Sequence, residues 1–205
     1  AGNLLGGEQS GFIAEIGFDM YQKILDEALR ELKRDEFSEL FKDEEPDFTT
    51  QDCQVESHSE LLIPDSYVRS IPERLSLYSD LAKINSLEEL NKFGFMLKDR
   101  FGPLPQPVLE LLDAVRLKWS ARELGLEKVS LEKDAIKAWF PSDQESAYYS
   151  SPFFGNMLKY ITGNPSLCRM KQTPKSLTVT FQGIRNIAAG ISLFEEIAQF
   201  ARANQ

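Results

Sequence analysis

The sequence predicts a mixed α/β fold of the α+β class, in which several helices pack on a small sheet built from one strand and two hairpins. Apolar residues recur at helical spacing over three consecutive segments between Ser70 and Gly125, and again near the end of the chain. Short alternating runs bounded by turn residues indicate a strand before these helices and two hairpins after them. The pattern predicts a mixed sheet but not the order of its strands.

Two of the three consecutive helices have a predicted N-terminal cap. Ser70 with Glu73, and Ser86 with Glu89, fit S-x-x-E, in which the serine hydroxyl accepts from a helix amide and the glutamate reaches back to the cap amide. Pro72 lies in the first turn, where its missing N–H costs nothing. The expected apolar stripes are Leu75, Tyr78 and Ala82 in the first helix, Leu87, Leu90, Gly94, Leu97 and Phe101 in the second, and Val108, Leu111, Leu112, Val115 and Trp119 in the third.

Glycine and proline mark where these helices end. The second helix is expected to stop at Gly102-Pro103, because glycine can take a positive φ and proline cannot continue a helix. The third helix starts near Pro105 and runs to Gly125. Their short connections imply antiparallel neighbours that share a core.

The strand signals lie on both sides of the helices. Residues 52–63 alternate, with Cys53 and Val55 on one face. The first hairpin is predicted from residues 128–131 and 135–140, turning at Lys133-Asp134, and the second from residues 166–171 and 176–181, turning around Thr173-Pro174.

Two more helices complete the predicted fold. Residues 143–151 are polar and predicted to be a loop, and a helix over about 152–161 follows. A last helix over about 184–203 is expected to turn inward Ile184, Ile187, Ala188, Ile191, Phe194, Ala198 and Ala201.

The chain divides into a predicted tail, residues 1–48, and a domain, residues 49–205. The tail contains a glycine-rich loop, a helix over about 18–41, and the acidic run from Asp43 to Asp47, which has the composition of a solvated linker. Because the chain begins at Ala1 inside what resembles a motif, we expect a C-terminal fragment of a longer protein.

Charge and composition limit the classes of function that this chain can have. The net charge is −9, and residues 1–100 carry 11 basic and 22 acidic side chains, so strong autonomous binding to nucleic acid is disfavoured. We expect a cytoplasmic protein, because no apolar run near 18 residues and no signal-peptide pattern occurs. Cys53 and Cys168 are expected to be two reduced, buried thiols.

A family resemblance arises from IPERLSLYSDLA followed by LKDRFGPLPQPVLELLDAVRLKWSARELG. These residues resemble the C-terminal domain of bacterial transcription-repair coupling factors, in which an R-L-x-x-Y helix (here Arg74, Leu75 and Tyr78) precedes a helix ending D-R-F-G-P-L-P (here 99–105). The matches keep their order over about 60 residues, so the resemblance is specific.

The resemblance implies a role in repair. The parent would use ATP and magnesium in its motor domains to move on duplex DNA, displace a stalled RNA polymerase and recruit UvrA. Its C-terminal domain would be a clamp on the N-terminal UvrB-like module of the same protein, hiding the UvrA-binding surface. For this fragment itself we expect no enzymatic activity, no cofactor, no membrane contact and a monomer.

The resemblance also implies site residues. The segment GNLLGGEQSGFIAEIGFDMY is similar to the end of the translocation motif shared with the RecG helicase, which assigns Gly6, Gly7 and Gln9 to a loop near DNA. For the clamp contact, the expected residues are Asp99, Arg100, Met96 and Glu89, with Glu88 and Asp80 as weaker alternatives.

Other functions remain open. A small hydrolase using His58 with Glu56 or Glu60 lacks a nucleophile signature, metal-ligand spacing and a glycine-rich phosphate loop. A DNA-contacting accessory domain of a RecG-like helicase would use the Gln9 loop. Arg169 and Lys171 could contact a phosphate or an acidic partner, although two basic residues on an outer strand face are usually only solvated.

Overall fold

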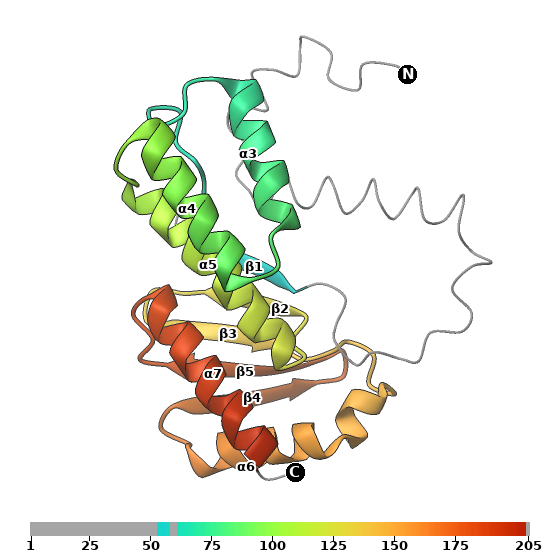
Figure 1. Ribbon diagram of the computed structural model, residues 1–205. Coiled ribbons are helices and arrows are strands. Elements are labelled where there is room, and N and C mark those ends of the chain that lie inside the picture. Colours follow the sequence, from blue (N-terminus) through green and yellow to red (C-terminus); the bar gives the residue numbers. More distant parts are fainter. Residues whose placement is uncertain (1–52, 58–60, 204–205) are drawn as a thin grey trace, which may run out of the picture. The chain divides into compact units, whose positions relative to one another are not determined.

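The computed structural model describes residues 53–57 and 61–203 (Figure 1). Its elements are β1 (Gln54–Ser57), α3 (Ile71–Lys83), α4 (Leu87–Phe101), α5 (Gln106–Glu123), β2 (Lys128–Leu131), β3 (Ala135–Trp139), the 3₁₀ turn η1 (Ala147–Ser150), α6 (Pro152–Gly163), β4 (Cys168–Thr173), β5 (Ser176–Gln182) and α7 (Ile187–Ala203). These helices and one five-stranded sheet confirm the predicted α+β class. The predicted helix over 18–41 lies outside the described residues, and the boundary between residues 48 and 49 stays a prediction.

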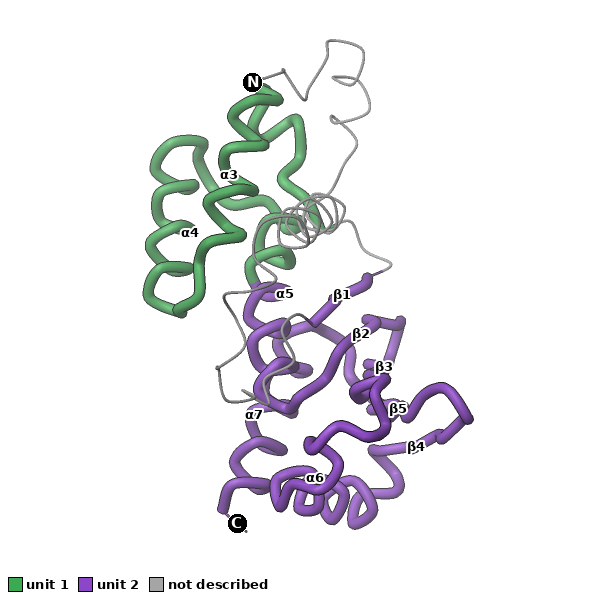
Figure 2. Tube along the Cα trace, turned by 90° about the vertical axis from the view of Figure 1, so that its right-hand side faces the viewer, with its two compact units in different colours: residues 1–43, 59–112 green, residues 44–58, 113–205 purple. Residues whose placement is uncertain are grey.

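The chain forms two compact units, coloured separately in Figure 2. Among the described residues, unit 1 comprises residues 61–112, with α3, α4 and the start of α5. Unit 2 comprises residues 53–57 and 113–203, with the rest of α5, the sheet, α6 and α7. The division therefore falls within α5.

In unit 1 both predicted serine caps are formed. The hydroxyl of Ser70 accepts from the amide of Glu73 at 3.4 Å, and that of Ser86 accepts from the amide of Glu89 at 3.2 Å. The two glutamates differ from the expected arrangement. The Glu73 carboxylate pairs with Arg100 of α4, and the Glu89 carboxylate accepts from the amide of Asn85 at 3.3 Å, one residue before the cap.

The core of unit 1 includes buried side chains of both helices, Leu77 and Leu81 of α3 and Leu90, Phe93 and Leu97 of α4. The prediction that Leu87 faces this core is wrong, because Leu87 is 50% exposed. The buried face of α4 is centred on positions 90, 93 and 97, and a residue three positions before 90 lies at the margin of that face.

Unit 2 is built on a mixed sheet of strand order β1-β2-β3-β5-β4. Strand β1 pairs with β2 in parallel, and every other pair is antiparallel. The predicted hairpins are β2–β3 and β4–β5, with the second turn one residue later than expected. Strand β1 is shorter than the predicted segment 52–63, and residues 61–63 are not strand.

One face of the sheet is apolar and faces helices. Its two cross-strand rows are Val55, Val129, Ala138, Val179 and Met170, and Ser57, Leu131, Ile136, Phe181 and Cys168. Helix α7 packs there, with the Phe194 ring 5.6 Å from that of Phe181, edge to face. Gly190 allows this approach, because a Cβ at that position would clash with Ile136. Figures 1 and 2 both show α5 and α7 on this side.

Helix α7 differs from its prediction at its start. It begins at Ile187 rather than 184, because the side chain of Asn186 caps it by accepting from the amide of Ala189 at 2.8 Å. Ala188, predicted to face inward, is exposed, and Gly190 and Leu193 are buried instead.

Smaller features complete the comparison. The predicted loop over 143–151 contains η1. Cys53 and Cys168 are both buried and form no disulfide, as predicted. Among the helices of the described residues, none combines the length and the apolar character that crossing a membrane would require.

Candidate functional site

The four predicted clamp residues Asp99, Arg100, Met96 and Glu89 lie on helix α4, whereas the weaker alternative Asp80 lies exposed on α3. Tyr67 supports the C-terminal end of this helix, because its hydroxyl lies 3.0 Å from the carbonyl oxygen of Leu97 and 2.9 Å from that of Gly102. The Tyr67 ring also packs edge-on against Phe101, with ring centroids 5.8 Å apart. A tyrosine hydroxyl is protonated at neutral pH, and burial raises the pKa of Tyr67 further, so this donor persists to more alkaline pH than an exposed one. The last turn of α4 is thereby held in place.

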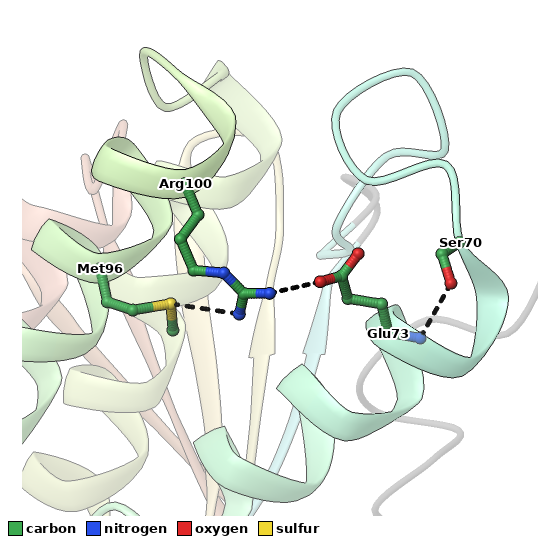
Figure 3. A network of polar contacts seen from close by, with 4 residues as sticks. All are labelled: Ser70, Glu73, Met96 and Arg100. Carbon is green, nitrogen blue, oxygen red and sulfur yellow. Dashed lines mark hydrogen bonds and ion pairs between the residues drawn. The ribbon is translucent and has the colours of Figure 1, made fainter.

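Arg100 is tied to α3 at this end of the helix (Figure 3). Its guanidinium forms an ion pair with Glu73, lies 4.9 Å from the centroid of the Phe101 ring, and reaches the sulfur of Met96 at 3.8 Å. The side chain of Arg100 is nevertheless 48% exposed. Arg100 is therefore both oriented by its neighbours and accessible to a partner.

Asp99 and Phe95 point in a different direction from Arg100. They are four residues apart, so they are neighbours on one stripe of the helix, whereas Met96 and Arg100 form the next stripe. Asp99 is exposed, and no ion pair links it to any other residue in the described part. The Phe95 side chain is 73% exposed, the highest value among the large apolar residues described.

Phe95 is the residue that sequence reasoning missed. The expected stripe of α4 passed through Gly94 and Leu97 and left Phe95 without a role. A usable signal existed in the sequence. The helical period that turns Gly94 and Leu97 inward turns Phe95 outward, where an amphipathic helix is expected to be polar. An aromatic residue on the outward face of a helix is a typical anchor for a protein partner.

The remaining predicted residues are placed less favourably. Glu89 lies at the other end of α4, where its carboxylate is engaged with the amide of Asn85, so the structure does not bring it to the group around Asp99. Glu88 forms an i,i+4 pair with Lys92 at 2.6 Å. Gly6, Gly7 and Gln9 lie outside the described residues.

Of the three residues of the hydrolase alternative, the structure describes only Glu56. His58 and Glu60, two members of the hydrolase alternative, lie outside the described residues, and Glu56 pairs with Lys128 at 2.8 Å. Within residues 53–57 and 61–203, no three His, Cys, Asp or Glu side chains gather as metal ligands would. The surface made by Phe95, Met96, Asp99 and Arg100, here called the α4 surface, offers an apolar anchor beside charges of both signs, which suits recognition of another protein.

Comparisons with known proteins identify the segment that carries this surface. The family model described as the TRCF domain matches residues 57–151. The chain is 39% identical over 129 residues to the transcription-repair-coupling factor of Escherichia coli K12, which covers 63% of this chain and 11% of that protein. It is 33% identical over 138 residues to that of Bacillus subtilis 168, which covers 67% of this chain and 11% of the relative. The aligned part thus spans about a tenth of these relatives.

A solved structure supports the fold independently. The crystal structure of the C-terminal domain of a transcription-repair coupling factor matches with a TM-score of 0.57 at 16% identity, covering 77% of this chain and 98% of that chain. At this identity the likeness concerns the fold alone. The family match and the related sequences show that residues 57–151 carry a TRCF domain, the domain of the transcription-repair coupling factor family, and the solved structure agrees with them in fold.

Proposed function

We propose that this chain is the C-terminal regulatory domain of a transcription-repair coupling factor and that its α4 surface clamps the N-terminal UvrB-like module of the same protein. The parent would be an ATP-driven translocase on duplex DNA that displaces stalled RNA polymerase. The clamp would hide the surface that recruits UvrA until RNA polymerase is engaged. Residues 1–48 would be the tail of the motor, with Gly6, Gly7 and Gln9 in its DNA-facing loop.

The observation that carries the proposal is the exposure of Phe95 beside Asp99, on a helix within the segment that matches the TRCF domain. A 73% exposed phenylalanine gains favourable free energy when a partner covers it. A charged residue at its side adds specificity and on-rate, because mismatched charges are rejected. A basic pocket with an apolar floor on the partner would complement both residues.

Arg100 suits such an interface because its position is already set. The ion pair with Glu73 and the contact with the Phe101 ring restrict its rotamers before any partner arrives. Binding then costs less side-chain entropy than it would for a freely rotating arginine. Arg100 supplies donors for a carboxylate or carbonyl of the partner, while Asp99 accepts from basic groups.

A titration tests the proposal. The 205-residue chain is mixed with the separately expressed N-terminal UvrB-like module of the same protein, and the heat of binding is measured at low and moderate salt. We expect binding that weakens as salt rises and that Asp99→Arg weakens at least tenfold. Phe95→Ser should weaken it at both salt concentrations to a similar extent, because its contribution is apolar.

The control is Glu195→Arg, an equal charge reversal at an exposed position of α7 in unit 2. Equal affinities for the original chain and Asp99→Arg would contradict the α4 surface as the contact. If the separate parts do not associate, UvrA binding to the full-length protein decides, because tethering raises the effective concentration of the module. Unchanged UvrA access after Asp99→Arg in that protein would contradict the clamp itself.

A further inference from the structure

The second face of the sheet in unit 2 is polar and strongly biased in charge. Its two cross-strand rows, here called the outer face, are Gln54, Lys128, Trp139, Thr178 and Lys171, and Glu56, Ser130, Lys137, Thr180 and Arg169. Four of these ten residues are basic and one is acidic, which gives +3 in a chain whose net charge is −9. In unit 2, α5 and α7 lie on the opposite, apolar side (Figures 1 and 2).

Two lysines of this face lie close to one aromatic ring. The ammonium of Lys128 lies 5.0 Å and that of Lys137 lies 4.7 Å from the centroid of the Trp139 ring. Both distances suit cation–π attraction, which holds the ammonium groups over the sheet. Lys128 also pairs with Glu56 at 2.8 Å, so Lys137 brings a positive charge that no acidic residue of this face neutralises.

Protection of the sheet edge does not account for these lysines. Charged residues on an edge strand prevent further strand pairing, and this reason suffices for Arg169 and Lys171 on the edge strand β4. Strands β2 and β3 are internal strands of the sheet, paired on both sides, so Lys128 and Lys137 have no edge to protect. Four cations facing one way instead raise the local concentration of an anionic partner.

The chemistry of the face favours single-stranded nucleic acid among anionic partners. Strands β2 and β4 are three strand spacings apart, about 14 Å, so the cations can follow a short stretch of extended phosphate backbone. An indole ring on a flat face can stack an unpaired base, which a duplex does not offer. A base that stacks on Trp139 displaces an ammonium group, and this group is then free to meet the adjacent phosphate.

We propose that the outer face binds single-stranded nucleic acid, through phosphate contacts from Lys128, Lys137, Arg169 and Lys171 and through stacking of a base on Trp139. Ser130 and Thr180 lie between these residues and add hydroxyl groups to the same surface, whereas Thr178 is buried and its hydroxyl donates to the carbonyl oxygen of Lys171 at 3.3 Å. The proposal does not depend on the clamp, because it uses other residues in the other unit. The acidic first half of the chain makes low ionic strength the condition under which binding is strongest.

The test is the fluorescence anisotropy of a labelled oligothymidylate titrated with the 205-residue chain over a series of salt concentrations. We expect saturable binding. The logarithm of the association constant should fall with the logarithm of the salt concentration, with a slope of about 0.7 per phosphate contact. Lys137→Glu combined with Lys171→Glu should weaken binding at least tenfold and reduce that slope by about 1.4, because two contacts are lost. Trp139→Leu should weaken binding about tenfold and leave the slope unchanged.

The matched control is Lys83→Glu combined with Arg185→Glu, which changes the net charge equally at two exposed positions that do not belong to the rows of the outer face. Circular dichroism and urea unfolding check that each variant folds. If Trp139→Leu does not fold, quenching of Trp139 fluorescence by the oligonucleotide in a Trp119→Phe background replaces it, because Trp119 is the only other tryptophan.

Four results would overturn the proposal. These are no binding at the lowest salt, equal weakening by the control pair, tighter binding of a duplex than of the single strand, and equally effective competition by polyglutamate of the same charge. The last result would assign the face to an acidic polypeptide instead. Unquenched Trp139 in the bound state would also contradict the stacking contact.

Discussion

The contacts that stabilise the two units of this chain join residues at very different separations in the sequence. In unit 1, Tyr78 accepts from the amide of Ile63, and Tyr67 holds the end of α4, so each of these contacts joins residues no more than 35 positions apart. In unit 2, β1 pairs with β2 more than 70 positions later. The helices of unit 1 are therefore defined by local signals. The sheet of unit 2 also depends on pairing between strands that are far apart in the sequence, which no local pattern predicts.

The units also differ in the surface that they leave exposed. Unit 1 exposes an aromatic side chain beside a carboxylate, Phe95 beside Asp99. Unit 2 exposes a sheet face on which Lys128 and Lys137 lie over Trp139. An apolar anchor with mixed charges suits a protein partner, and clustered cations with an aromatic ring suit an anionic one. One small chain thus presents two surfaces of different chemistry.

The largest expected difference between the units comes from one buried and one exposed phenylalanine. Phe194 of α7 is fully buried against Phe181, so Phe194→Ala should lower the free energy of unfolding by about 3–5 kcal/mol. Phe95→Ala, on the exposed face of α4, should change it by less than about 0.5 kcal/mol. Urea unfolding followed by circular dichroism measures both. A comparable loss in the two variants would show that Phe95 belongs to a core.

Two glycines with positive φ sharpen the comparison. Gly125 in unit 2 has φ 74°, and a Cβ there would run into the ring of Tyr148. Gly125→Ala should therefore cost backbone strain and repacking, about 2–5 kcal/mol in total. Gly102 in unit 1 has φ 91° and no atom within 4 Å of its would-be Cβ, so Gly102→Ala should cost only the backbone strain, about 1–3 kcal/mol.

Thermal unfolding of the two alanine variants measures this difference. The double variant Gly125→Ala with Tyr148→Phe is a control for the hydroxyl, which donates to the carbonyl oxygen of Leu124 at 2.7 Å. The ring remains in that variant, so the clash should persist. Equal destabilisation by Gly125→Ala and Gly102→Ala would contradict a steric role for Tyr148.

The smallest expected effect is a pH dependence in unit 2. Burial raises the pKa of the Cys168 thiol from 9.0 to about 11, so the folded chain holds this proton more tightly than the unfolded chain does. The resulting stability is present below about pH 9 and is lost as the pH rises towards about 11. Urea unfolding between pH 8 and 11 should show a steeper decline for the original chain than for Cys168→Ala.

The comparison with Cys168→Ala is needed because burial also raises the pKa of Tyr148 and Tyr160, which remain in both chains. The contribution of Tyr148 to the alkaline decline therefore cancels in the difference. The charge of Cys168 is one of the causes that raise the pKa of Tyr160, so Cys168→Ala removes that part of the Tyr160 contribution together with its own. Parallel declines would show that the Cys168 thiol is solvated in the folded chain.

Much of the fold was predictable because its signals are local. The caps at Ser70 and Ser86 and the stop at Gly102 identify three helices to within one or two residues. Alternation over β2, β3, β4 and β5 identifies both hairpins, since each hairpin closes through a short turn. The start of α7 was predicted too early, because Ile184 fits the apolar period while the cap at Asn186 lies after it.

The candidate sites were less predictable, because exposure is a property of packing. Helical spacing placed Met96 and Arg100 together, but only the packing of α3 beside α4 pairs Arg100 with Glu73 and leaves Phe95 uncovered. In the same way, Arg169 and Lys171 looked like ordinary solvated residues. Their association with Lys128, Lys137 and Trp139 arises only when β5 pairs with β3.

The sequence by itself determined the class of the fold, the helices with their caps, the hairpins and the family resemblance, because each depends on residues a few positions apart or on an ordered run of matches. The tertiary structure alone decided the strand order, the parallel pairing of β1 with β2, and which side chains share a surface. The physical reason is that the pairing of distant strands and the burial of a helix face depend on the free energy of the whole core. The residues of one short segment do not determine that free energy.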